Sequence, residues 1–169
     1  MTVLYVTSQE QGVGKTAFCA SLAADLKRRG KSVVAVKLTA ALGDEHDSNV
    51  YQRLLRQVEE LVPIQVSNGV IGANQLREIK AVANKLVDGQ DLLVVESSSA
   101  ISDKGSVSLT EALSARVVVV ERYSGGLKGA ELVKWRSLFG DSLLGITINL
   151  RSRYSDAAVR SILLPSIES

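Results

Sequence analysis

The chain has 169 residues, 46% of them hydrophobic and 22% charged, which is the balance of one folded domain rather than of a disordered chain. A net charge of +2 and only 4% aromatic residues argue against a nucleic-acid-binding surface. The single cysteine, Cys19, cannot form an internal disulfide, and no apolar stretch approaches the roughly 18 residues of a membrane helix. We therefore expect a soluble, cytoplasmic protein with neither a nucleic-acid nor a membrane partner.

Short apolar runs alternate along the chain with helical patterns. The runs, at residues 3–6, 33–36, 92–95, 117–120 and 143–148, are rich in β-branched residues and too short for helices, which indicates strands buried on both faces. Apolar stripes at helical spacing predict helices over residues 16–29, 74–87 and 127–139, each followed closely by a glycine. Strands joined through helices must pair in parallel. The sequence thus predicts an α/β fold of three layers, a mostly parallel sheet with helices on both faces.

A glycine-rich loop joins the first predicted strand to the first helix. It reads Ser8-Gln9-Glu10-Gln11-Gly12-Val13-Gly14-Lys15-Thr16. Its glycines let successive backbone amides point at a phosphate, and the helix adds its positive N-terminal end. In such a P-loop, Lys15 reaches the β- and γ-phosphates and Thr16 places its hydroxyl on Mg²⁺. The alternative is a plain turn that starts a helix, with its lysine in solvent. The residues predicted to bind nucleotide here are Gln11, Gly12, Val13, Gly14, Lys15, Thr16 and Ala17.

Polar residues follow other predicted strands at the edge of the sheet where ligands gather. Lys37 is predicted to act with Lys15 in catalysis by neutralising a γ-phosphate or holding a small anionic substrate, the alternative being a lysine that merely leaves the core. Glu96 is predicted to hold Mg²⁺ directly or through water, the alternative being an exposed carboxylate. The amide of Asn149 matches a purine edge, although an asparagine here is equally expected to begin a turn.

The polar loop at residues 40–47 offers one more metal ligand. Asp47 is predicted to complete the Mg²⁺ shell and also resembles a helix cap, and the two roles are compatible. His46 has no partners at metal-ligand spacing, so we expect a surface histidine. Three serines at residues 97–99 follow Glu96, but the only histidine is far from them, which excludes serine hydrolase chemistry.

The loop from Ser8 to Thr16 resembles that of dethiobiotin synthetases, and more closely that of the dethiobiotin-synthetase-like domain at the N-terminus of long bacterial phosphotransacetylases. The likeness covers nearly the whole chain: Lys37 falls on the family's Lys-Pro strand end, Glu96 on its Glu-Gly motif, and Asn149 on the strand that reads adenine. The resemblance implies a P-loop NTPase-type fold that binds ATP, with GTP not excluded, together with Mg²⁺. It also implies one domain over residues 1–169 that lacks the family's terminal strand, as a fragment of a longer protein would.

This chain departs from dethiobiotin synthetases at the positions that contact the substrate in that family. Dethiobiotin synthetases follow the second-strand lysine with proline and a small pair, whereas this chain has Leu38-Thr39-Ala40-Ala41. The turn after Glu96 has no glycine, which limits how closely the backbone can approach a ligand. We therefore expect a slow ATPase or a nucleotide-sensing module. The alternatives are an ATP-dependent carboxylating ligase, in which Lys37 binds a carbamate, and a degenerate structural domain. Related P-loop domains often dimerise across the nucleotide face, which leaves a homodimer open.

Overall fold

The computed structural model describes residues 2–39, 51, 53, 64–65, 71–98, 100–123 and 129–149. In this part of the chain six strands form one parallel sheet in the order β3-β2-β4-β1-β5-β6. The strands are β1 (Thr2–Thr7), β2 (Val33–Thr39), β3 (Ile64–Gln65), β4 (Leu92–Glu96), β5 (Arg116–Arg122) and β6 (Leu143–Asn149). The helices are α1 (Lys15–Arg28), α3 (Ala73–Val87), α4 (Asp103–Leu113) and α5 (Gly129–Phe139), with a short 3-10 turn at Gly140–Ser142.

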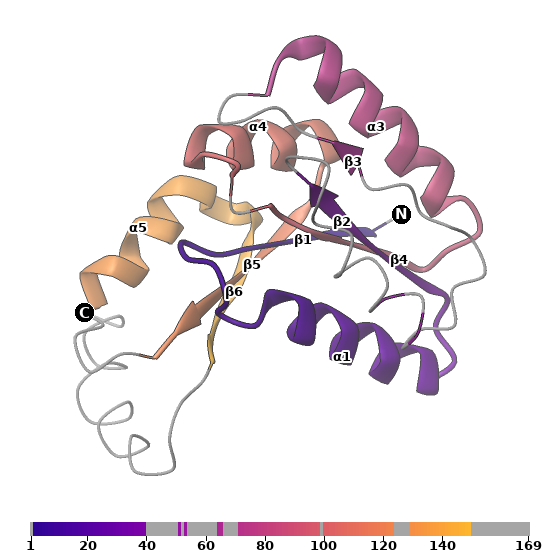
Figure 1. The fold of residues 1–169 in the computed structure, drawn as a ribbon, viewed down its shortest axis with the longest axis horizontal. Coiled ribbons are helices and arrows are strands. Elements are labelled where there is room, and N and C mark those ends of the chain that lie inside the picture. The colour runs from indigo at the N-terminus through magenta and orange to yellow at the C-terminus, as the bar shows by residue number, and fades with distance from the viewer. Residues whose placement is uncertain are drawn as a thin grey trace.

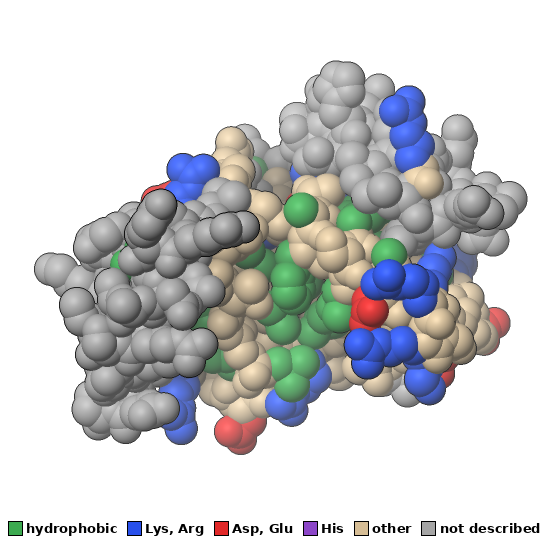
Figure 2. All heavy atoms as spheres, turned by 90° about the horizontal axis from the view of Figure 1, so that it is seen from below, with side chains coloured by type: hydrophobic (Ala, Val, Ile, Leu, Met, Phe, Trp, Pro, Cys, Tyr) green, Lys and Arg blue, Asp and Glu red, His purple; other side chains and the backbone are tan. Residues whose placement is uncertain are grey.

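Helices cover both faces of the sheet, so the predicted three-layer α/β fold is confirmed. Helix α1 lies on one face, and α3, α4 and α5 lie together on the other (Figure 1). Each face has its own core. Cys19, Ala20 and Ala23 of α1 pack with buried strand valines on the first face, and Trp135 of α5 is among the largest buried side chains on the second. From the side of α1, hydrophobic side chains occupy the centre of the described surface, with charged ones beside them (Figure 2).

The five predicted runs all form strands, and the predicted helices match α1, α3 and α5, although the start of the third falls partly outside the described residues. One expectation was wrong, and α4 and the two-residue strand β3 were not predicted. Helix α4 was missed because it carries serines and threonines where an apolar stripe is expected, and the Ser102 hydroxyl accepts the Gly105 amide as its cap. Strand β6 is half-buried rather than buried on both faces, because it lies at one edge of the described sheet. None of the described helices has the length and apolarity to cross a membrane.

The strand register positions the candidate site. Strand β4 lies between β1 and β2, and Glu96 at its end pairs with Val6 on one side and with Lys37 on the other. The loop that leaves β1 therefore begins beside Glu96. Because the strands are parallel, Lys37 and Glu96 lie at the same edge of the sheet, as predicted, although β2 continues beyond Lys37 to Thr39.

Candidate functional site

The loop between β1 and α1 turns on two glycines. Gly12 and Gly14 have φ of 68° and 93°, the left-handed region that side chains with a Cβ rarely adopt. Gly14 is also the N-cap of α1, and a Cβ built on it would lie 2.3 Å from the side-chain nitrogen of Asn149. That nitrogen donates a hydrogen bond of 2.9 Å to the carbonyl of Val13. Asn149, at the end of β6, thus ties the loop to the far side of the sheet.

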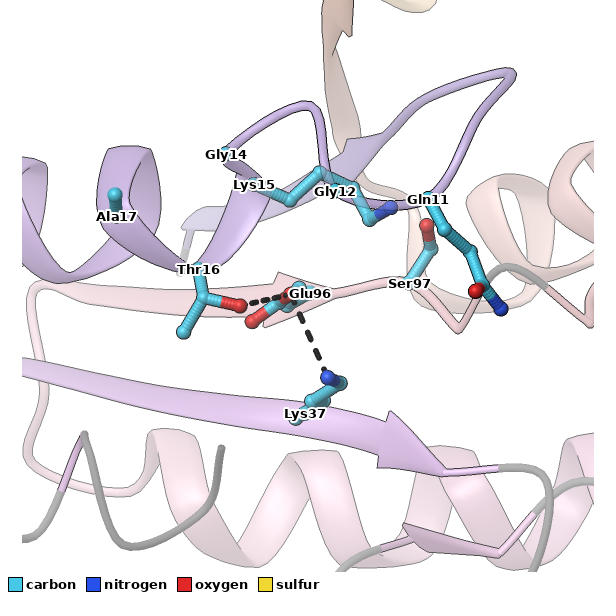
Figure 3. Close-up of a pocket in the computed structure, with 9 residues that line it drawn as sticks. All are labelled: Gln11, Gly12, Gly14, Lys15, Thr16, Ala17, Lys37, Glu96 and Ser97. Carbon is cyan, nitrogen blue, oxygen red and sulfur yellow. Dashed lines mark hydrogen bonds and ion pairs between the residues drawn. The ribbon is translucent and has the colours of Figure 1, made fainter. Parts of the chain in front are cut away.

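The start of α1 combines a cation with an uncapped helix end. Lys15 is the first residue of the helix, which has neither a side-chain cap nor an acidic residue in its first turn. A cation near a helix N-terminus is unfavourable by about 0.3–1 kcal/mol in exposed helices. Lys15 is only 8% exposed, and its Nζ donates to the Ser8 hydroxyl at 2.6 Å, so the side chain extends along the inside of the loop (Figure 3). An anion at this point would relieve the repulsion between the ammonium group and the helix end.

Glu96 is a buried carboxylate, 2% exposed, with donors at both oxygens. The Thr16 hydroxyl donates to Oε1 at 2.7 Å, and Lys37 Nζ stands 3.9 Å from the same oxygen (Figure 3). The Tyr51 hydroxyl donates to Oε2. A buried charge needs such compensation, because an unpaired carboxylate would lose its hydration without replacement.

A cavity of about 410 Å³ brings most of the predicted residues together. It is lined by Gln11, Gly12, Gly14, Lys15, Thr16, Ala17, Lys37, Glu96 and Ser97. Val13 is fully buried, and Asn149 contacts the loop from behind. Asp47 and His46 lie outside the described residues. The cavity therefore combines two ammonium groups with two hydroxyls and a carboxylate, a set suited to a phosphate anion and a hard cation.

The family model CbiA, described as the CobQ/CobB/MinD/ParA nucleotide binding domain, matches residues 4–164. The chain belongs to this family. The match confirms the predicted nucleotide-binding P-loop domain and is broader than the dethiobiotin-synthetase-like resemblance.

Solved structures support the same fold at low identity. A ParA family ATPase from Chlorobium tepidum TLS shares 17% identity at a TM-score of 0.59, covering 99% of this chain and 81% of that one. The kinase domain of the Escherichia coli tyrosine kinase ETK shares 15% at 0.59, covering 88% and 67%. The signal recognition particle 54 kDa protein from Aeropyrum pernix K1, in complex with GDP, shares 18% at 0.59, covering 95% and 39%.

Sequence reasoning missed a second acidic position in this CbiA domain. Glu121, the last residue but one of β5, is buried and accepts a hydrogen bond of 2.8 Å from the indole of Trp135. Lys134 donates to the Gln9 side chain at 2.9 Å and lies 4.5 Å from the centre of the Trp135 ring. Burial raises the pKa of Glu121, and the charge of Glu10 adds to the rise, whereas the Trp135 hydrogen bond and Lys134 oppose it. These contacts connect the first half of the loop between β1 and α1 with α5.

Tyr51 is the other residue that sequence reasoning missed. It lies 45 positions from Glu96, so no local pattern marks the contact between them. Cys19, by contrast, is the packed thiol that the sequence indicates: it is fully buried, and burial raises its pKa. Ser97 donates to the Thr7 hydroxyl at 3.1 Å, and the Ser98 hydroxyl accepts the Ala100 amide at 3.3 Å. These two serines therefore have structural partners in the CbiA domain rather than a catalytic base.

Proposed function

We propose that this domain binds ATP with Mg²⁺ at the loop between β1 and α1 and acts as a slow ATPase or a nucleotide sensor. The observation that supports it most is the convergence of Lys15, Thr16, Lys37 and Glu96 on one cavity. Lys15 would bind the β- and γ-phosphates with the loop amides, and Ala17 would add an amide from the first turn of the helix. Lys37, on the opposite wall, would approach the γ-phosphate.

The residues present fit a magnesium ion. Mg²⁺ prefers oxygen ligands and is often held by one or two carboxylates and hydroxyls together with the phosphates of the substrate. The Thr16 hydroxyl donates a hydrogen bond to Glu96, which leaves the lone pairs of the Thr16 oxygen available to bind the ion. Thr16 would thus hold the ion, Glu96 would hold it directly or through water, and Asp47 stays a predicted further ligand. When bound, the ion would neutralise charge that develops on the phosphates.

The same geometry supports slow rather than fast turnover. Phosphoryl transfer depends on positioning and charge stabilisation, which Lys15 and Lys37 can supply, and on a group that orients the attacking water. Among the described residues, Glu96 is the one carboxylate in the cavity wall. Its oxygens accept hydrogen bonds from Thr16 and Tyr51, and in this proposal the carboxylate serves the metal ion rather than the attacking water.

Isothermal titration calorimetry tests the proposal. We expect Mg-ATP to bind in the micromolar range, about −8 kcal/mol. Lys15→Ala should abolish binding because it removes the phosphate-binding ammonium group. The matched control is Lys31→Ala, an exposed lysine that pairs with Asp91 at 3.8 Å before β2 begins, and it should bind as the wild type does. Unchanged affinity in Lys15→Ala would contradict the proposal.

A second candidate is the ATP-dependent carboxylating ligase implied by the dethiobiotin synthetase resemblance. It is favoured by the position of Lys37, whose side chain is 11% exposed and lines the cavity opposite the loop. There it could hold a carbamate for phosphorylation. Phosphate release with diaminononanoate, bicarbonate and ATP should exceed the substrate-free rate if this candidate is right. A rate no higher than with ATP alone would eliminate it, and no rise in melting temperature with nucleotide would instead favour a structural domain.

A further inference from the structure

Tyr51 is a buried tyrosine whose hydroxyl reaches the candidate metal site from the core. It is 2% exposed and belongs to the hydrophobic cluster beneath α1, together with Cys19 and Val94. Its hydroxyl donates to Glu96 Oε2, while the hydroxyl of Thr16 donates to Oε1. Tyr51 is absent from the residues that line the cavity. Its contact with the site is therefore made through the carboxylate of Glu96.

The two hydrogen bonds fix the plane of the Glu96 carboxylate. The terminal torsion of a glutamate is broad and roughly two-fold, so one hydrogen bond alone leaves the group free to rock about that torsion. With Oε2 held by Tyr51 from the core and Oε1 held by Thr16 from α1, the rotation is restricted from both sides. A restricted Oε1 in turn directs the proton of the Thr16 hydroxyl toward Glu96 and its lone pairs toward the cavity.

We propose that Tyr51 is a positioning residue for Glu96 and thereby sets the magnesium dependence of nucleotide binding. The proposal rests on the proposed function. Tyr51 holds the carboxylate in the orientation in which Thr16 presents its oxygen to the ion. Phosphate binding without metal relies on Lys15, whose Nζ donates to the Ser8 hydroxyl, and on the amides of the loop between β1 and α1. The metal-free affinity for nucleotide therefore depends little on Tyr51, whereas the gain in affinity with Mg²⁺ depends on it.

Tyr51→Phe tests this proposal, because it removes one oxygen atom and keeps the ring in the core. ATP affinity is measured by calorimetry in EDTA and over a range of Mg²⁺ concentrations. Removing a residue that orients a metal ligand typically weakens metal affinity about 10–100-fold. We expect a rise of at least about 10-fold in the Mg²⁺ midpoint, which is the Mg²⁺ concentration that gives half of the metal-dependent gain in ATP affinity, and an unchanged ATP affinity in EDTA. A melting curve verifies that the variant folds.

Tyr5→Phe is the matched control. Tyr5 is fully buried, and its hydroxyl bonds to Ser106 of α4 at 3.1 Å on the opposite face of the sheet. This variant also loses a buried tyrosine hydroxyl, so it reproduces the general effect on stability without touching Glu96. Its Mg²⁺ midpoint should equal that of the wild type.

A third arm uses the Glu96→Gln background. If Tyr51 acts through the carboxylate, adding Tyr51→Phe to Glu96→Gln should shift the Mg²⁺ midpoint no further. An equal shift in both backgrounds, or equal midpoints for Tyr51→Phe and the wild type, would overturn the positioning role and leave the proposed function intact. Failure of the wild-type protein to bind ATP under any condition would overturn both.

Discussion

Replacing Gly14 by alanine measures how tightly the loop is tied to β6. The new Cβ would stand 2.3 Å from Asn149 Nδ2, whereas ordinary contact begins at 3.4 Å, so the amide must move by about 1 Å. Such a movement breaks its hydrogen bond of 2.9 Å to the Val13 carbonyl. In addition, alanine must adopt the positive φ of Gly14.

The expected cost has two parts. A left-handed conformation costs a non-glycine residue about 1–2 kcal/mol. Loss of the Asn149 hydrogen bond costs about 0.5–1.5 kcal/mol. Gly14→Ala should therefore lower the free energy of unfolding by about 1.5–3.5 kcal/mol, and for a domain of this size each kcal/mol lowers Tm by about 2–4 °C. The drop in Tm is then about 3–14 °C.

Urea unfolding of four variants separates the two parts. Gly12→Ala is the control for the backbone, since Gly12 also has positive φ but a Cβ there would meet nothing within 4 Å. In the Asn149→Ala background there is no amide to displace, so Gly14→Ala should cost about 1 kcal/mol less than in the wild type. An identical cost of Gly14→Ala in both backgrounds would refute the argument that the amide fills the space beside Gly14.

Two further predictions concern charged residues at the strand ends. Burial raises the pKa of Glu121 above its ordinary value of 4.5, so the folded state binds the carboxyl proton more tightly than the unfolded state does. The free energy of unfolding should therefore fall as pH rises from 4.5 through the raised pKa, by about 1.4 kcal/mol for each unit of pKa difference. Glu121→Gln keeps an acceptor for Trp135 and should abolish this fall; urea unfolding over a pH series measures the free energy, and the same pH dependence in the variant would contradict the prediction. Lys37→Gln should weaken ATP binding about 10–100-fold and ADP binding less, because a hydrogen bond to a charged group contributes about 1.5–3 kcal/mol and ADP has no γ-phosphate. Calorimetry with both nucleotides measures the difference, and equal losses would place Lys37 away from the γ-phosphate.

Local patterns predicted the strands, most of the helices and the loop, because burial in a parallel sheet favours β-branched runs and a phosphate loop needs glycines at fixed spacing. The same patterns did not separate two acids. Glu96 and Glu121 each follow four apolar strand residues, yet one faces the cavity and the other the indole of Trp135. Register distinguishes them: Glu96 is level with Val6, whereas the pairing of Thr7 with Val119 sets Glu121 beyond the end of β1.

The long-range contacts of the site were also beyond local patterns. Tyr51 stands in the sequence like any core aromatic residue, and its partnership with Glu96 arises only when the chain packs α1, β4 and residue 51 together. Helix α4 likewise depends on its packing against α3 and β1, since its own residues show no clear apolar stripe. In each case the missing information was which segments meet in space.

Trp135 is the single tryptophan of the chain, so all indole emission comes from one known place. Its ring has Lys134 over one face, its nitrogen bonds to Glu121, and Lys134 also holds the side chain of Gln9. Any rearrangement of the first half of the loop must therefore alter the electric field at this fluorophore. Trp135 is therefore an intrinsic fluorescent probe, and ligand binding can be followed in unlabelled protein by the wavelength and intensity of its emission.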